Sequence, residues 1–363
     1  MDTVFTQRGF LPCPDPLDRF PEDSEFAMLD EIGHDLPNLL EDPGFRTHAR
    51  ELEIPLWPQR PVQPDELPAL HLCYVRLGFL SSAFINQIGE ESTTVLPANI
   101  AIPLCRVCSL LQRPPILSYD GYALYNWKRI RPAGPIALGN LETLQNFVHL
   151  HDEHWFILVH VEIEAIAANI LRAISSTRKA LTRNDFDTID NELVLVENAL
   201  RRQILVLKRI PEKMDPALYH RTFRHYIRFF ENVTYEGIDQ APISFRGETG
   251  AQSSILPTLV AFLKIPHKPS PLMSHLSDMR RYMPAEHRAL IEAVETMPPI
   301  RHLANKDIFN NVLDALAEFR EIHFNWAEQY INRWVDDPRG TGGTPFMSLL
   351  QQLIDETRAY QRV

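Results

Sequence analysis

Apolar residues recur at intervals of three and four along most of the second half of the chain, which is the spacing of an α-helix that buries one face. This spacing predicts helices in the following segments: 141–181, as two helices or one broken one, 185–210, 216–230, 253–265, 285–297 and 305–335. Pro211 ends one run and Pro216 opens the next, as expected of a residue that breaks helix interiors but suits a first turn. Strand-like alternation is scarce, so the sequence predicts an all-α fold.

The first 140 residues differ from the rest of the chain in proline content and in helical periodicity. Much of the proline, which totals 29 residues against 14 glycines, lies there, and only segments 23–40 and 70–88 have clear helical periodicity. Dense proline divides helices into short pieces. We therefore predict a smaller, loop-rich helical domain over residues 1–140 and a large helical domain over residues 141–363, with the functional site at their junction.

Composition excludes several classes of protein. A net charge of -11 argues against nucleic-acid binding, which needs clustered positive charge. No segment approaches the ~18 uninterrupted apolar residues of a membrane span, and the amino terminus lacks the basic start and apolar block of a signal peptide. Four cysteines are too few for a disulfide scaffold, so we expect a cytoplasmic protein. Cys105 and Cys108 form a CxxC without a second pair or a nearby histidine, which favours structural thiols over a redox or metal role.

Two histidines lie on apolar helical faces. Spacing places His323 with Phe319 and Trp326 on one face of segment 305–335, and His160 lies on the apolar face of segment 141–181. An imidazole that loses water needs a hydrogen-bond partner or a metal. Each histidine alone is better interpreted as a core residue with a backbone partner, whereas a pair on separate long helices favours a cofactor site. One imidazole flanked by aromatic rings suits an axial haem ligand better than a non-haem iron or catalytic zinc site, whose motifs are missing.

Glycine and small polar residues gather in two loops, 244–254 and 336–350, each just before a helix. Such loops are either ordinary linkers and caps or segments that close over a ligand. Neither has the lysine and spacing of a phosphate-binding loop.

Motifs spread over most of the chain resemble the indoleamine 2,3-dioxygenases, haem enzymes that open the indole ring of tryptophan. They are, in chain order, "RGFLPCPDPL", "ALYNWKRI", "FRGETGAQSS", "MRRYMPAEHRALIEAVE" and "GTGGTPFMSLL". The resemblance implies haem b as cofactor and insertion of both atoms of O2 into the C2–C3 bond of L-tryptophan, or of a related indole, to give N-formylkynurenine. It also implies an electron donor that keeps the iron ferrous, and we expect a monomer.

The resemblance also implies roles for individual residues. His323 falls where the family carries its haem ligand, and Phe319 lies one turn before it. The residues expected around the substrate and over the haem are Tyr119, Phe156, His160, Tyr219, Arg224, Thr249, Gly250 and Thr341. Phe156 is expected to pack on the indole, and Thr341 to close on the amino-acid ammonium or carboxylate. Arg224 matches the arginine that holds the substrate carboxylate, a task that its planar fork suits; without the resemblance it reads as a solvated helix residue.

Two positions depart from the family pattern. His160 stands where indoleamine dioxygenases usually have serine and where the related tryptophan 2,3-dioxygenases have histidine, which favours substrates with an unmodified indole nitrogen. The loop that usually reads GGSAGQSS has Glu248 in place of a glycine. This carboxylate either pairs with a substrate ammonium or points to solvent, and we expect the outward orientation. The alternatives to tryptophan oxidation are therefore a haem enzyme for a modified tryptophan or other indole, a haem-binding sensor without turnover, and a cofactor-free helical interaction protein.

Overall fold

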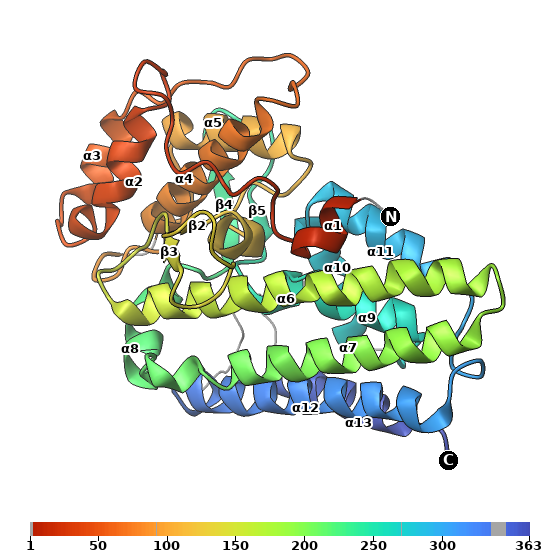
Figure 1. Ribbon diagram of the computed structural model, residues 1–363. Coiled ribbons are helices and arrows are strands. Elements are labelled where there is room, and N and C mark those ends of the chain that lie inside the picture. Colours follow the sequence, from red (N-terminus) through yellow and green to blue (C-terminus); the bar gives the residue numbers. More distant parts are fainter. Residues whose placement is uncertain (1–2, 92, 270, 335–345) are drawn as a thin grey trace.

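The computed structural model describes residues 3–91, 93–269, 271–334 and 346–363. It is 58% helical and 5% strand, which confirms the all-α prediction (Figure 1). In the first part of the chain the helices are α1 Thr3–Arg8, α2 Met28–Leu39, α3 Phe45–Glu51, α4 Leu67–Ile85, α5 Ala98–Leu110 and the π-helix η1 Asp120–Leu124. The second part holds α6 His151–Leu181, α7 Phe186–Leu207, α8 Pro216–Arg221, α9 Ile255–Leu263, α10 Pro271–Met279, α11 Ala285–Glu295, α12 Lys306–Tyr330 and α13 Met347–Ala359. Short 3₁₀ turns are η2 Ile210–Glu212, η3 Phe223–His225, η4 Gly250–Gln252, η5 Arg280–Tyr282 and η6 Asn332–Trp334.

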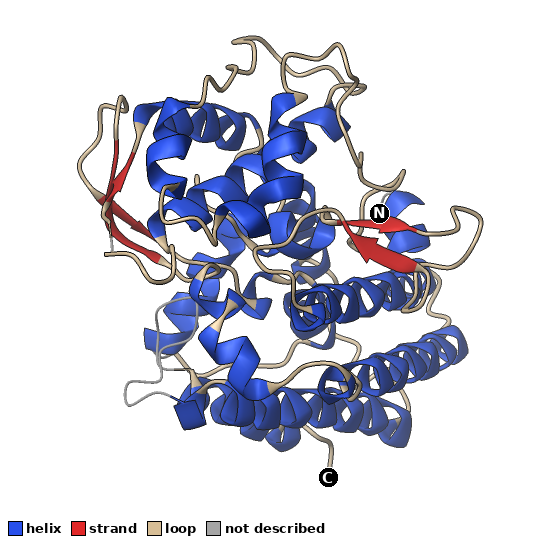
Figure 2. Cartoon of the chain, turned by 90° about the vertical axis from the view of Figure 1, so that its left-hand side faces the viewer, coloured by secondary structure: helices blue, strands red, loops and turns tan. Residues whose placement is uncertain are grey.

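The strands are short and form two small sheets. They are β1 Val95–Leu96, β2 Trp127–Arg129, β3 Leu141–Thr143, β4 Phe230–Tyr235 and β5 Ile243–Phe245. In the described chain β1 pairs parallel to β4, β4 pairs antiparallel to β5, and β2 pairs antiparallel to β3. Figure 2 shows the two sheets on opposite sides of the helices of the first part. Pairing of β1 with β4 fastens the segment around residue 230 to the first part of the chain.

Three long helices carry the second part. α7 packs against both α6 and α12, and α13 packs on α12 (Figure 1). The first turns of α7 and α12 are capped as the sequence allows: the Asp185 side chain accepts from the Thr188 amide before α7, and the Asn305 side chain accepts from the Asp307 and Ile308 amides before α12. Segment 141–181 gives one unbroken helix from His151 after the strand β3. This frame holds α6 and α12 on either side of α7.

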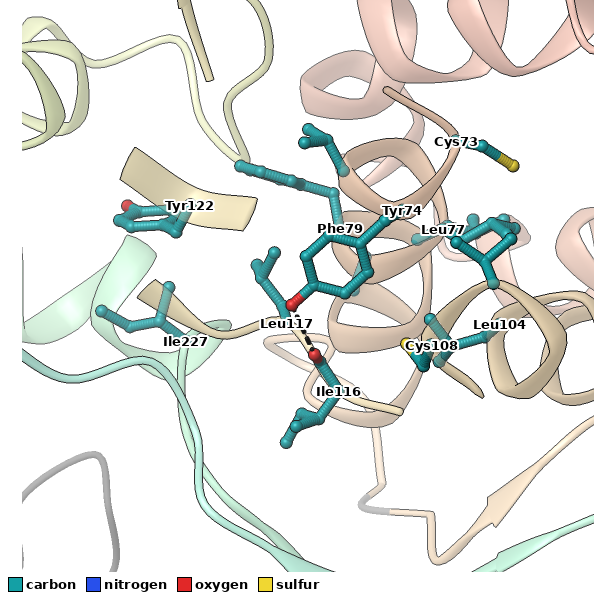
Figure 3. Close-up of a cluster of buried hydrophobic side chains, with 14 of the residues drawn as sticks. Cys73, Tyr74, Leu77, Phe79, Leu104, Cys108, Ile116, Leu117, Tyr122 and Ile227 are labelled. Atoms are coloured by element: carbon teal, nitrogen blue, oxygen red, sulfur yellow. Dashed lines mark hydrogen bonds between the residues drawn. The ribbon is translucent and has the colours of Figure 1, made fainter. Parts of the chain in front are cut away.

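The apolar helix α4 lies at the centre of the first part. By length and mean hydropathy it passes the test for a membrane span, but 83% of that apolar window is buried inside the protein, as in a core helix. Tyr74 on α4 donates its hydroxyl to the Ile116 carbonyl at 2.9 Å (Figure 3). The free thiols of Cys73 and Cys108 lie in the same cluster, and burial raises both of their pKa values.

The helix predicted over 216–230 is shorter than expected. α8 ends at Arg221 because Thr222 has φ -117° and ψ -108°, which is not helical, and its hydroxyl donates to the Leu218 carbonyl. The chain then makes the turn η3 and enters β4 at Phe230. Pairing of β4 with β1 and β5 therefore overrides the local helical pattern, and Arg224 lies in a tight turn instead of on a helix face.

Candidate active site

His323 lies on α12, in the apolar stripe that the sequence predicts. Its side chain is exposed, yet the pKa is lowered to about 4, first because the surrounding protein excludes water and second because of the charge that His160 would carry. At neutral pH the imidazole is uncharged and keeps a nitrogen lone pair, the form that binds a metal.

Other polar groups on the same part of α12 find protein partners. Trp326 donates its indole N–H to the Leu207 carbonyl at 3.2 Å, and Tyr330 donates its hydroxyl to the Met214 carbonyl at 2.8 Å. Neither ring nitrogen of His323 has a hydrogen bond to any residue that the structure describes. The described residues therefore supply no protein partner for this imidazole, and a ligand from outside the chain fits.

His160 is fixed in one tautomer on α6. Its Nδ1 lies 2.7 Å from the Phe156 carbonyl oxygen, and since a carbonyl only accepts, Nδ1 carries the proton. Burial lowers the pKa of the ring, so Nε2 is left as a neutral acceptor. The ring packs edge-on against Phe156 at 4.6 Å and Tyr119 at 5.9 Å between centroids. The charge that His160 would carry also lowers the pKa of His323, so the two rings lie near each other.

Aromatic rings from α6, α8 and η3 surround Phe156. Its ring centroid lies 5.7 Å from that of Tyr219 and 6.0 Å from that of Phe223. Arg224 is buried, and its positive charge lowers the pKa of Tyr219 against the larger effect of burial. The interpretation of Arg224 as a solvated helix residue is therefore wrong. A buried guanidinium beside an aromatic wall suits an anionic ligand group.

Glu164, which the sequence analysis did not single out, joins the Tyr119 segment to loop 246–253. Its Oε1 accepts from the Tyr119 hydroxyl at 2.9 Å and from the Ser253 hydroxyl at 2.7 Å. Gln252 completes the connection by accepting from the Tyr119 amide and donating to the Gly247 carbonyl, each at 2.9 Å. Burial raises the pKa of Glu164 to about 7. A glutamate one turn after His160 in an apolar run was the signal available in the sequence.

Glu248 does not point to solvent as we expected. It is 3% exposed, and burial raises its pKa to about 8. The reason lies in the preceding glycine, because a Cβ at Gly247 would collide with the backbone of Ile227 and Arg228. This close approach turns the following residue inward. Burial is the largest cause that raises the pKa values of Tyr119, Tyr122 and Tyr219, and the Glu248 charge raises each of them further.

The burial and contacts of the remaining residues predicted for the site are as follows. Thr249 is half-buried and accepts from the Ala251 amide at 3.4 Å. Gly250 is exposed, and a Cβ there would meet no described atom within 4 Å, which leaves room beside the loop. Phe319 is half-buried against the core of the second part. Thr341 lies outside the described residues.

A model of the indoleamine 2,3-dioxygenase family matches residues 3–334. The chain belongs to this family. Indoleamine 2,3-dioxygenase 1 of Rattus norvegicus is 28% identical over 96% of this chain and 92% of the relative. Indoleamine 2,3-dioxygenase 2 of Mus musculus is 30% identical over 98% of this chain and 93% of the relative. A 6-hydroxytryptophan 2,3-dioxygenase of Fusarium equiseti is 27% identical over 89% of this chain and 82% of the relative.

Indoleamine 2,3-dioxygenases are haem-dependent, and the residues of this site fit that group. The observation that decides the fit is His323, a neutral imidazole that no described residue hydrogen bonds. Gly250 adds open space beside the loop. Membership of the family also identifies the chain as a dioxygenase oxidoreductase that acts on indoles.

The burial of Glu248 predicts a pH dependence of folding. Its pKa is about 8 in the folded protein against 4.5 in the unfolded chain, so the native state binds the extra proton and the free energy of unfolding falls as pH rises through this window. At about 1.4 kcal/mol per pKa unit, we expect Glu248→Gln to gain on the order of 3 kcal/mol over wild type at pH 8.5 and little at pH 5. Melting temperatures without ligand at both pH values measure this. The exposed Glu231→Gln serves as control, and a constant difference between pH 5 and 8.5 for Glu248→Gln would contradict the burial.

Proposed function

We propose that this protein is a haem-dependent dioxygenase that inserts both atoms of O2 into the C2–C3 bond of the indole of L-tryptophan, giving N-formylkynurenine. Membership of the family supports the reaction class. One observation carries the assignment to this site: His323 and His160 are neutral imidazoles on different helices, close enough for the charge of one to lower the pKa of the other. The aromatic rings of Phe156 and Tyr119 pack against His160.

The residues of this chain would divide the work as follows. His323 would hold the iron of haem b, and the haem when bound supplies the activation of O2. Phe156 packs against the indole, and the Nε2 atom of His160 accepts the indole N–H. Arg224 binds the substrate carboxylate through its guanidinium. Together these contacts orient C2 and C3 and keep water from the indole.

The proposal also includes a reductant, the oligomeric state, the localisation and the loops beside the site. A reductant of unidentified nature keeps the iron ferrous, and O2 and the indole enter a monomeric, cytoplasmic enzyme. Thr249, Gly250 and Thr341 belong to the loops expected beside haem and substrate. Of these, Thr341 lies outside the described residues, so its role rests on the family resemblance alone.

Product analysis tests the substrate. The haem-loaded, reduced protein is given O2 and L-tryptophan, and N-formylkynurenine is followed by absorbance and mass spectrometry. Full haem loading without product from any indole would leave a haem-binding sensor as the better account.

A second candidate is the same reaction on a ring-hydroxylated tryptophan. The relative from Fusarium equiseti acts, by its name, on 6-hydroxytryptophan. The observation that favours it here is Glu248, a carboxylate buried among site tyrosines, because such a group can accept from a phenolic hydroxyl. Competition between L-tryptophan and 6-hydroxytryptophan for the same enzyme measures kcat/KM for each and decides between the candidates.

The tautomer of His160 predicts discrimination at the indole nitrogen. In wild type, 1-methyl-L-tryptophan leaves Nε2 without its hydrogen-bond donor, and a buried polar atom left unsatisfied costs about 1–3 kcal/mol. We expect kcat/KM for 1-methyl-L-tryptophan to be about 10- to 100-fold below that for L-tryptophan, and the gap to narrow to a few-fold in His160→Ser. Steady-state kinetics on both substrates measures the ratio. An unchanged ratio in the variant would show that Nε2 does not meet the indole N–H.

A further inference from the structure

The buried carboxylates of the first part of the chain and of the site have partners among the described residues, with the exception of Glu248. Asp120 forms an ion pair with Arg113. Glu153 accepts from two backbone amides and the Tyr122 hydroxyl, and Glu164 accepts from two hydroxyls. The Glu248 carboxylate has no hydrogen bond or ion pair with any residue that the structure describes, and no positive charge of those residues lowers its pKa. An unpaired buried carboxylate is costly for the folded state.

The position of this carboxylate is fixed by its loop. Gly247 is pressed against the backbone of Ile227 and Arg228, and its carbonyl accepts from Gln252. The side chain that follows lies near tyrosines from two elements, Tyr119 and Tyr122 at η1 and Tyr219 on α8. Tyr119 in turn packs on His160, and Tyr219 packs on Phe156. Glu248 therefore lies beside the aromatic rings that pack around His160 and Phe156.

Arg224 and Glu248 act on Tyr219 with opposite signs. Arg224 lowers the pKa of Tyr219 and Glu248 raises it, so both charges lie near this ring. Arg224 nevertheless forms no ion pair with Glu248, which has none with any residue that the structure describes. A ligand that carries an anion and a cation a few bonds apart matches this arrangement. An α-amino acid has a carboxylate for Arg224 and an ammonium group for Glu248.

We propose that Glu248 binds the α-ammonium group of the substrate and that Glu248 and Arg224 together select zwitterionic amino acids over indoles that lack the amine. This inference rests on the proposed function, because it takes the bound ligand to be an amino-acid indole. The ammonium group supplies the positive partner that the described chain does not give to Glu248.

Ligand titrations of the ferric haem-loaded protein test the proposal. The shift of the haem absorbance gives a Kd for L-tryptophan, tryptamine and indole-3-propionate, the last of which lacks the amine. In Glu248→Gln we expect the Kd values of L-tryptophan and tryptamine to rise about 10-fold or more, as for loss of a charged hydrogen bond, and that of indole-3-propionate to stay within about twofold. Glu248→Gly, which restores the residue of the family loop, is expected to behave in the same way. The exposed Glu231→Gln is expected to match wild type.

Several results would overturn the inference. Equal loss of affinity for indole-3-propionate would mean a general effect on the pocket, and unchanged affinities would mean that the carboxylate does not touch the ligand. With 6-hydroxytryptophan titrated alongside, loss confined to that ligand would place Glu248 at the benzene ring instead of the ammonium. If wild type responds to no indole, the proposed function fails and this inference with it, whereas wild-type binding with an unaffected Glu248→Gln rejects the inference alone.

Discussion

Replacement of His323 by alanine is expected to abolish haem retention and indole oxidation together. The ring has no hydrogen bond to a described residue and is uncharged at neutral pH, so iron coordination is the role left for it. Its removal is also expected to leave folding intact, because no protein partner is left unsatisfied. The haem absorbance after purification with haem supply and the turnover of L-tryptophan measure both effects, with turnover falling by about 10³-fold or more.

His34→Ala is the matched control for this experiment, since His34 is an exposed histidine on α2. We expect it to retain wild-type absorbance and turnover. Added imidazole is expected to restore part of the haem spectrum of His323→Ala by occupying the space of the missing ring. A variant that keeps both the wild-type spectrum and wild-type turnover would disprove the assignment of His323 as the axial ligand.

Arg224→Ala is expected to cause the second largest loss. Truncating one partner of a buried pair between a guanidinium and a carboxylate costs about 2–5 kcal/mol. We therefore expect kcat/KM for L-tryptophan to fall about 100-fold in this variant. Tryptamine, which lacks the carboxylate, is expected to change by less than about threefold. Steady-state kinetics with both substrates separates carboxylate binding from damage to the fold.

The neighbouring Arg221 provides the control. It is exposed at the end of α8, and Arg221→Ala is expected to keep wild-type kinetics. Equal losses for tryptamine and L-tryptophan in Arg224→Ala would instead indicate that Arg224 only supports the neighbouring Tyr219, on whose pKa its charge acts.

The sequence was sufficient where local periodicity and burial agree. α7 and α12 follow the predicted apolar spacing and begin at side-chain caps, so their positions need no distant information. The helix predicted over 216–230 is too long because β4 pairs with β1, which is distant in the chain, and local spacing carries no information about such a pairing. The division of the chain near residue 140 stays a prediction.

The same distinction holds for the site. Spacing placed His323 on the apolar face of its helix, whereas its exposure and its lack of a described partner required the tertiary structure. The family resemblance supplied the site roles of Arg224 and His160. Local patterns alone would have assigned Arg224 to the surface and His160 to the core. Glu248 was misjudged because its burial depends on how closely Gly247 approaches another backbone segment. Glu164 was missed because its hydroxyl partners come from distant segments.

Oxygen labelling tests the central claim most directly. The reduced, haem-loaded protein is mixed with ¹⁸O2 and L-tryptophan in ordinary water, and the product is analysed by mass spectrometry before its formyl group can exchange. The proposed function predicts N-formylkynurenine that carries two ¹⁸O atoms. A product with one label, or no product from fully haem-loaded protein, would contradict it.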